Sequence, residues 1–272
     1  MTDAWYEVLD EPDAGGAAAT ARVRATELTI GPWERGVQHA GPPAALLTRA
    51  VRRLGGAPDA ALPARLCFDI SAPVPIGDLT LTSRMLRPGR KVALAEATLA
   101  TTTHPDRPLM VLRAWLLRQR HEPLPAVYTT RTAPPPPDGP VQPRPVEWLN
   151  GYVDTIEWRW SSGGFFEPGP ATVWLRQHVR LVAGEDPSGL ERLVAVADSA
   201  GGISGIASPL DLLFVNTDLT LHVQREPVGT DIWMQAETTV DAAGIGRTRS
   251  ELGDALGAVG QGSQCLFVEP RR

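Results

Sequence analysis

The sequence predicts an α+β protein built from two tandem units, in each of which a long antiparallel β-sheet wraps around one helix. Three observations lead to this prediction. A proline-rich segment divides the chain of 272 residues near its middle. The same order of one helix followed by several strands and tight turns occurs on both sides of that segment. Apolar and polar residues also alternate along the strands, as they do in sheets with one buried face.

The first half contains one predicted helix, from about Pro42 to Leu54, which begins with two prolines. Proline suits the first helical positions because an amide donor is not needed there. The strand-like segments that follow are RLCFDISAPV, DLTLTSRML, VALAEATLATT and LMVLRAWLLRQR. Turn residues separate them, at Pro75 to Gly77 and at PGRK. We therefore expect a run of antiparallel strands after the helix.

The second half repeats this order. A helix is predicted from about Ser188 to Ser199, after the segments TIEWRW and ATVWLRQHVRLV. The strand-like segments after it are LLFVNTDLTLHVQR, DIWMQAETTV, TRSELGDA and QGSQCLFVEPR. A long antiparallel sheet around one central helix is the hotdog fold, so two tandem copies predict a double hotdog. Its two sheets are expected to join into one continuous antiparallel sheet around two central helices.

The predicted units are residues 1–125 and 148–272, and a proline-rich linker at 126–147 connects them. Proline lacks an amide donor and fixes φ. The run TTRTAPPPPDGPVQPRP therefore suits neither a helix nor an inner strand.

Several segments resemble the acyl-CoA thioesterase II-like family of double-hotdog proteins. They are GPWERGVQHAGPPAALLTRAV, IEWRWSSGGFFEPGPATVWLR, VADSAGGIS, FVNTDLTLHVQREP and GSQCLFVEPR. The resemblance keeps the order of these segments and covers nearly the whole chain. It implies a hydrolase that acts on acyl-CoA or a related acyl thioester in lipid metabolism.

Asp198 is a carboxylate near the C-terminal end of the second predicted helix, where the partial negative charge of the helix disfavours it. With about 100° per residue, Asp198 lies roughly 80° from Leu190, at the edge of the apolar stripe. Burial and the helix dipole should both raise its pKa. Asp198 either closes the helix by bonding to backbone amides or acts as a base. The resemblance favours a base, because it implies a catalytic aspartate at this point.

Hydrolysis of a thioester requires an activated water and a stabiliser for the oxyanion. The resemblance implies that a hydroxyl residue on the next strand and a glutamine on the last strand assist the aspartate. Gln264 matches the glutamine, whereas Asn216 stands in place of the hydroxyl and Thr217 follows it. Successive strand residues face opposite sides, so only one of Asn216 and Thr217 should face the site. Hydrogen bonding within turns or between strands is the alternative role for both. For Gln264 the alternative is a solvated strand residue.

The segment VQHAGPP at the entry to the first helix is a candidate for substrate binding. Pro42 and Pro43 leave the amides around Gly41 and Ala44 at a helix N-terminus, where a carbonyl oxygen or an anion can bind. His39 precedes them and is a second candidate for substrate contact. A plain helix start and a structural histidine are the alternatives.

Two other functions stay open. The first is a dehydratase or hydratase of acyl thioesters, which would need a histidine–aspartate pair near a central helix. Among the histidines, only His39 is placed near one. The second is a non-catalytic protein that binds acyl thioesters, because Asn216 replaces the hydroxyl residue.

Composition limits the partners. The net charge of −5 argues against nucleic acid or an anionic membrane as the main partner. No apolar run approaches the ~20 residues of a membrane span, and the acidic N-terminus does not resemble a signal peptide. Metal-ligand spacing is absent among Cys67, Cys265 and the scattered histidines, so we expect no metal or other cofactor. The two cysteines are isolated thiols, so we expect a cytoplasmic protein. The expected partner is the acyl-thioester substrate, and a homo-oligomer is left open.

Overall fold

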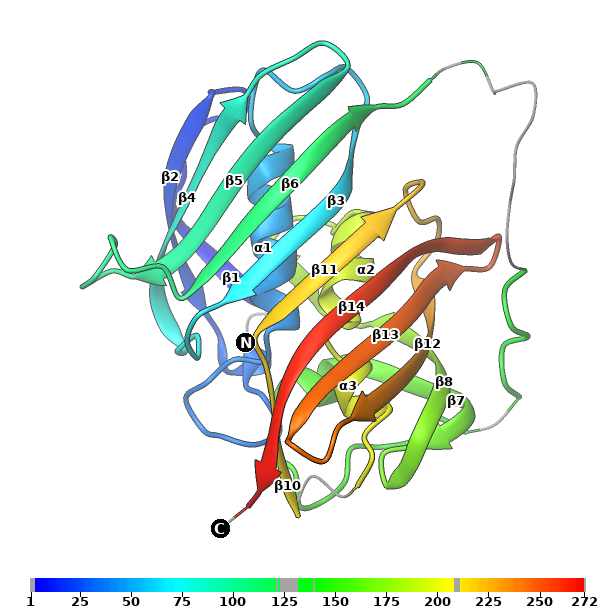
Figure 1. Cartoon of the computed structure of the whole chain (residues 1–272). Helices are drawn as coiled ribbons and strands as arrows, with labels where there is room; N and C mark the ends of the chain where they lie inside the picture. Colours follow the sequence, from blue (N-terminus) through cyan, green and yellow to red (C-terminus); the bar gives the residue numbers. More distant parts are fainter. Residues whose placement is uncertain (1–2, 121, 123–131, 139, 208–210, 272) are drawn as a thin grey trace.

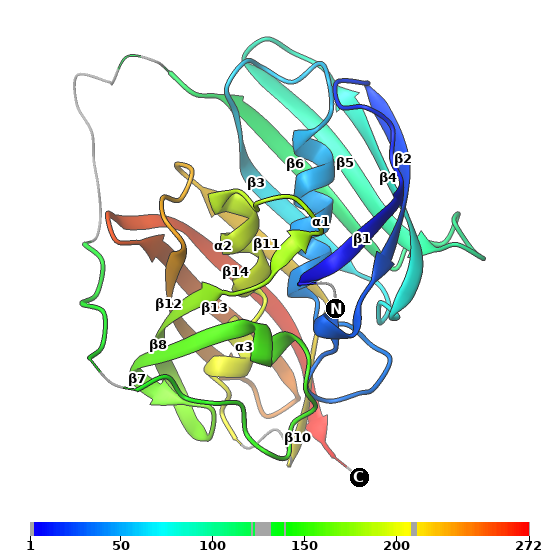
Figure 2. The same ribbon diagram turned by 180° about the vertical axis from the view of Figure 1, so that it is seen from behind.

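One long curved sheet wraps around two central helices (Figures 1 and 2). The computed structural model describes residues 3–120, 122, 132–138, 140–207 and 211–271. The predicted α+β double hotdog is thus confirmed. The predicted linker at 126–147 lies partly outside the described residues.

The first half supplies one helix, a short 3₁₀ turn and the strands of one end of the sheet. These elements are β1 (Ala4–Asp10), β2 (Ala18–Ala25), η1 (Glu27–Thr29), α1 (Gly41–Arg52), β3 (Ala61–Ile70), β4 (Gly77–Arg87), β5 (Val92–Thr101) and β6 (Met110–Arg118). The second half supplies η2 (Tyr152–Thr155), β7 (Ile156–Gly164), β8 (Glu167–Gln177), β9 (Arg180–Val182), α2 (Gly189–Ala197), α3 (Ala200–Ile203), β10 (Leu212–Asn216), β11 (Asp218–Val223), β12 (Asp231–Val240), β13 (Ile245–Asp254) and β14 (Gly257–Pro270).

The strand order is β7-β8-β12-β13-β14-β11-β3-β6-β5-β4-β2-β1-β9, and β10 pairs with the end of β14. The two halves meet where β11 pairs with β3, from Asp218 opposite Asp69 to His222 opposite Arg65. The sheet is therefore continuous, as predicted.

The sequence predicted one strand over residues 171–182, and this prediction was wrong. It breaks after Gln177, and β9 begins at Arg180 and pairs with β1 in parallel, the one parallel pairing among the described strands. Because β8 and β9 are so close in the chain, the chain passes directly from one end of the sheet to the other. The two ends of the sheet must therefore come together, which makes the sheet nearly surround the helices (Figure 2).

Helices α1 and α2 run antiparallel and touch at both ends. At one end, a Cβ at Gly41 would lie 2.1 Å from the carbonyl oxygen of Ala195, so this position requires glycine. At the other end, Glu226 accepts hydrogen bonds from the Arg52 guanidinium (2.9 Å) and from the Leu190 amide (3.0 Å). Every residue of α1 from Gly41 to Val51 is buried, as expected for a helix enclosed by a sheet and a second helix.

Ser188 fixes the start of α2 through a capping box. Its hydroxyl accepts a hydrogen bond from the Glu191 amide (3.2 Å), and the Glu191 carboxylate accepts one from the Ser188 amide (2.9 Å). The helix ends at Ala197, and the short helix α3 follows directly. The helix predicted from about Ser188 to Ser199 therefore ends two residues early, and the chain is helical again from Ala200 to Ile203.

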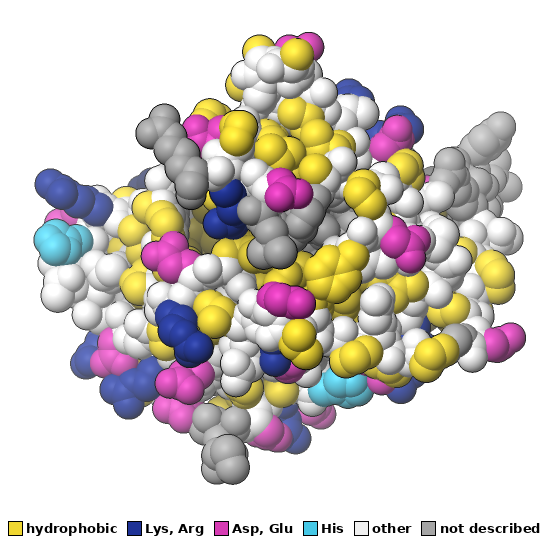
Figure 3. All heavy atoms as spheres, turned by 90° about the horizontal axis from the view of Figure 1, so that it is seen from below, with side chains coloured by type: hydrophobic (Ala, Val, Ile, Leu, Met, Phe, Trp, Pro, Cys, Tyr) yellow, Lys and Arg dark blue, Asp and Glu magenta, His cyan; other side chains and the backbone are white. Residues whose placement is uncertain are grey.

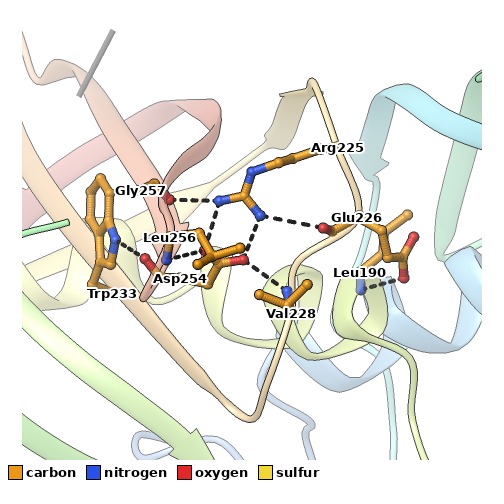
Figure 4. Close-up of polar contacts among 8 residues, drawn as sticks. All are labelled: Leu190, Arg225, Glu226, Val228, Trp233, Asp254, Leu256 and Gly257. Carbon is orange, nitrogen blue, oxygen red and sulfur yellow. Dashed lines mark hydrogen bonds and ion pairs between the residues drawn. The ribbon is translucent and has the colours of Figure 1, made fainter. Parts of the chain in front are cut away.

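Asp254 joins the β13–β14 turn to the loop after β11 (Figure 4). Its side chain is fully buried and accepts hydrogen bonds from both terminal nitrogens of Arg225 (2.5 and 2.6 Å), from the Val228 amide (2.8 Å) and from the Leu256 amide (2.9 Å). Burial alone would raise the pKa of Asp254, but these hydrogen bonds and the charge of Arg225 outweigh it and lower the pKa.

Replacement of Asp254 by alanine should lower the free energy of unfolding by about 3 kcal/mol at pH 7, because Arg225 loses its carboxylate partner and two amides lose their acceptor. Urea unfolding measures this loss. Glu237→Ala is the matched control, since Glu237 pairs with Arg249 on the protein surface, and it should cost less than about 1 kcal/mol. The difference between wild type and Asp254→Ala should shrink as the pH falls through the lowered pKa of Asp254. Equal losses for the two variants at pH 7 would contradict this account.

Candidate active site

Asp198 lies at the junction of α2 and α3, and its side chain is almost fully buried, with 5% exposed. The Asn216 amide nitrogen on β10 donates to Oδ1 (2.5 Å), and the Gln264 amide nitrogen on β14 donates to the same oxygen (3.2 Å). The backbone amide of Ala40, just before α1, also donates to the carboxylate. Both halves of the chain therefore hold this one side chain.

Hydrogen bonds at both the nitrogen and the oxygen orient the side-chain amide of Gln264. Its nitrogen also donates to the backbone carbonyl oxygen of Asp198 (3.1 Å), and its oxygen accepts a hydrogen bond from the Gly201 amide (3.1 Å). These contacts connect the last strand to both helices at the α2–α3 junction. Gln264 thus holds Asp198 in position from the last strand of the sheet.

Burial raises the pKa of Asp198 to about 7, although the hydrogen bonds from Asn216, Gln264 and Ala40 act in the opposite direction. The carboxyl group is therefore close to half ionised at neutral pH. A group with such a pKa can both take up and release a proton under these conditions.

His39 lies beside Asp198, with Nδ1 3.3 Å from Oδ2 of the carboxylate. Its ring stacks on the ring of Tyr152 with the centroids 3.9 Å apart, and the Tyr152 hydroxyl contacts the Ala195 carbonyl and the Ser199 hydroxyl, each at 2.9 Å.

Burial lowers the pKa of His39 to about 3, so the imidazole is neutral at pH 7. The Gly41 amide donates to the same Nδ1 (3.1 Å) and favours the ring proton on Nε2, whereas the Asp198 oxygen at 3.3 Å favours a proton on Nδ1 when Asp198 is ionised.

The amides at the start of α1 are occupied, contrary to expectation. The Gly41 amide bonds to His39, and the Ala44 amide bonds to the Ala40 carbonyl (3.1 Å). Pro42 and Pro43 have no amide hydrogen. Gly41 instead allows the close contact between α1 and α2 and orients His39, so both amides have partners within the protein.

Asn216 and Thr217 face opposite sides, as the alternation along a strand requires. Asn216 faces Asp198, whereas Thr217 is exposed and its hydroxyl contacts the Cys265 carbonyl oxygen (3.4 Å). The structure therefore brings together Asp198, Asn216, Gln264 and His39, and it leaves Thr217 outside.

A cavity of about 430 Å³ opens beside this cluster, and Asp198, His39 and Asn216 line it. Gln264 does not line the cavity. The cavity walls include β10 and the loop before α1, which lie at the lower end of the molecule in Figure 1. On that face, hydrophobic side chains gather around a hollow (Figure 3).

Sequence reasoning missed several residues of this site. Tyr152 supports His39, and Trp33, Trp148 and Phe165 line the cavity. Each stands in a loop or short turn with no periodic pattern, so only the concentration of aromatic residues in WERG, VEWLNGY and GGFFEPG could have indicated them.

Within the described ranges, no group of three or more histidine, cysteine, aspartate or glutamate side chains is arranged to hold a metal ion. Among the described helices, none has both the length and the apolar character that a membrane span requires.

Comparison with family models gives two adjoining matches. Residues 29–117 match the acyl-CoA thioesterase N-terminal domain, and residues 131–268 match the acyl-CoA thioesterase C-terminal domain. None of the curated proteins compared with the chain matched it.

Solved structures match the whole architecture. A protein assigned as a thioesterase II from Thermobifida fusca YX gives a TM-score of 0.71 at 16% identity, covering 96% of this chain and 95% of its own. A hot dog protein of unknown function from Alicyclobacillus acidocaldarius gives 0.68 at 16% identity, covering 94% and 95%. The acyl-CoA thioesterase II TesB2 from Mycobacterium marinum gives 0.67 at 11% identity, covering 97% and 96%. At these identities the likeness shows the shared fold.

Replacement of Asp198 by asparagine should stabilise the protein at pH 8. Because the pKa of Asp198 is raised to about 7, the folded protein binds this proton more tightly than the unfolded chain does. The contribution of Asp198 to stability therefore falls as the pH rises from about 4 to about 7. Asparagine carries no charge, so the variant should gain on the order of 2 kcal/mol at pH 8 and nothing at pH 4.

Thermal melts across this pH range measure the effect. Asp186→Asn is the control, because the Asp186 side chain is 88% exposed, and it should leave the pH dependence of Tm unchanged. A Tm difference between wild type and Asp198→Asn that does not vary with pH would contradict the raised pKa.

Proposed function

Since this chain belongs to the acyl-CoA thioesterase family, matched over both of its domains, we propose that it hydrolyses an acyl-CoA thioester with a water molecule activated by Asp198. One observation carries this proposal. A buried carboxylate with a pKa of about 7 lines an apolar cavity and is held there by Asn216 and Gln264.

In the proposed reaction, ionised Asp198 removes a proton from a water molecule while the water oxygen attacks the carbonyl carbon of the thioester. A carbon–oxygen bond forms, and the carbonyl electron pair moves onto the carbonyl oxygen. When that pair returns, the carbon–sulfur bond breaks. Asp198 then gives its proton to the departing thiolate, which leaves as CoA thiol beside the carboxylic acid. A pKa near the working pH suits both proton transfers.

Asn216 and Gln264 have different roles in this mechanism. Both donate to Oδ1 of Asp198, so Oδ2 is the oxygen available to receive the proton. Asn216 lines the cavity and can also hold the attacking water through its own amide oxygen. Gln264 does not line the cavity and acts as a positioning residue.

His39 is suited to stabilise the oxyanion. In the tautomer that the Gly41 amide favours, the neutral ring carries its proton on Nε2. A neutral N–H donor on a rigidly stacked ring favours the developing negative charge on the carbonyl oxygen. The stacking on Tyr152 keeps the ring in place during the reaction.

A hydratase of enoyl thioesters is the second candidate, and the separation of 3.3 Å between His39 and Asp198 is the observation that favours it. Water would then add to a carbon–carbon double bond and the thioester would survive. Incubation with a trans-2-enoyl-CoA separates the two candidates: hydrolysis releases free thiol, whereas hydration yields a hydroxyacyl-CoA without thiol release.

Asp198→Asn should reduce kcat for thiol release from a saturated acyl-CoA by about 10²–10⁴-fold, because asparagine keeps the shape but cannot accept a proton. The kcat/KM of wild type should rise with pH to a plateau, with an apparent pKa of about 7. Gln264→Ala should cost less, since Gln264 positions the base. Turnover at the wild-type rate in Asp198→Asn would refute the mechanism and favour a non-catalytic binding protein.

Asn216→Thr and Thr217→Ala form a matched pair on neighbouring residues. The threonine hydroxyl at 216 can donate to Asp198, so Asn216→Thr should keep activity within about tenfold of wild type, whereas Asn216→Ala should lose more. Thr217→Ala should leave kcat almost unchanged because Thr217 faces away from Asp198. A large loss in Thr217→Ala, with an unchanged Tm, would show that the strand presents the other face to the substrate.

A further inference from the structure

Aromatic rings from separate parts of the chain form one wall of the cavity. They are Trp33 in the loop before α1, Trp148 before η2, Trp158 on β7 and Phe165 in the β7–β8 turn. Neighbouring rings meet edge to face: Trp33 and Trp148 at 4.7 Å and 68°, Trp148 and Phe165 at 5.1 Å and 68°, Trp158 and Phe165 at 5.2 Å and 63°. We call these four residues the aromatic wall.

Contacts outside the aromatic wall hold its rings in place. Phe165 also contacts Trp160 edge to face at 5.2 Å, and Trp160 does not line the cavity. The indole nitrogen of Trp158 donates to the Val153 carbonyl (2.9 Å). Phe165 is 6% exposed and Trp158 is 3% exposed, so close packing leaves these rings little freedom to turn. The wall therefore presents fixed ring edges and faces to the acyl group.

Glycine also leaves the cavity open near Asp198. Gly202 lines the cavity, and a Cβ at this position would meet nothing within 4 Å. A planar ring is wider than a straight acyl chain and needs such open space.

We propose that the acyl group this cavity selects carries an aromatic ring, so that the substrate is an arylalkanoyl thioester. This inference rests on the proposed function and names its substrate class. A substrate ring can add edge-to-face contacts with the aromatic wall to the ordinary gain from burial. An alkyl chain with the same number of carbons obtains only the burial.

The test compares two substrates with nine acyl carbons each, 3-phenylpropanoyl-CoA and nonanoyl-CoA. Wild type should favour the aryl substrate by about tenfold in kcat/KM, which corresponds to one or two edge-to-face contacts. Phe165→Leu should remove most of this preference. Phe166→Leu is the matched control and should keep the preference. Phe166 is 54% exposed, does not line the cavity and reaches the wall only at Trp148, with the ring centroids 6.4 Å apart.

The outcomes separate the inference from the proposed function. If both thioesters are hydrolysed but nonanoyl-CoA is preferred, or if the preference survives in Phe165→Leu, the inference is wrong and hydrolysis stands. If neither is hydrolysed, the proposed function fails. Calorimetric Kd values of the two CoA esters for Asp198→Asn then decide the inference: tighter binding of the aryl ester supports it, and equal or weaker binding overturns it. Should Phe165→Leu not fold, Trp33→Leu serves instead, because Trp33 is 44% exposed at the rim and should lose part of the preference.

Discussion

The contact between the two antiparallel central helices is the constraint on which the other features of this protein depend. Gly41 lets the start of α1 approach the Ala195 carbonyl, and this approach places Ala40 and His39 next to the end of α2. The site is formed where the halves meet, because neither half alone supplies both His39 and Asp198. The sheet enforces the contact, since its two ends come together around the helix pair.

The burial of Asp198 comes at the expense of stability. Burial of this carboxyl raises its pKa to about 7, so its ionised form destabilises the folded state. Asp254 is equally buried but receives a guanidinium and two amides, and its pKa is lowered. The contrast lies in the partners: Asp198 has only neutral donors from Asn216, Gln264 and Ala40, which hold it in place without fixing its charge.

Much of the fold follows from local patterns in the sequence, and the parts that do not follow depend on distant contacts. Alternation, turn residues and the start of α2 at Ser188 are local features, and the structure agrees with them. The break between β8 and β9 was not predictable, because the partner of β9 is β1, at the far end of the chain. The hydrogen bond from the Gly41 amide likewise depends on the rotamer of His39. The aromatic wall was not predictable either, because several of its rings stand in loops without a periodic sequence pattern. Asp198, Asn216 and Gln264 were predictable as candidates from a resemblance, but their mutual distances required the fold.

A duplicated fold has two junctions between its central helices, and the residues at each explain why the site forms at only one. At the junction with the Asp198 cluster, the start of α1 meets the end of α2, and the loop before α1 leaves a cavity open. At the opposite junction, Gly189 occupies the place that Gly41 has in α1, and a Cβ there would lie 2.1 Å from the Pro227 carbonyl oxygen. Glu226 pairs there with Arg52. It also accepts a hydrogen bond from the Leu190 amide (Figure 4), so a carboxylate again meets a helix end. Its partner is a cation, however, and the Pro227 carbonyl packs directly against the start of α2. The same helix packing thus gives two different junctions: at one the carboxylate meets a cation, and at the other it lines an open cavity.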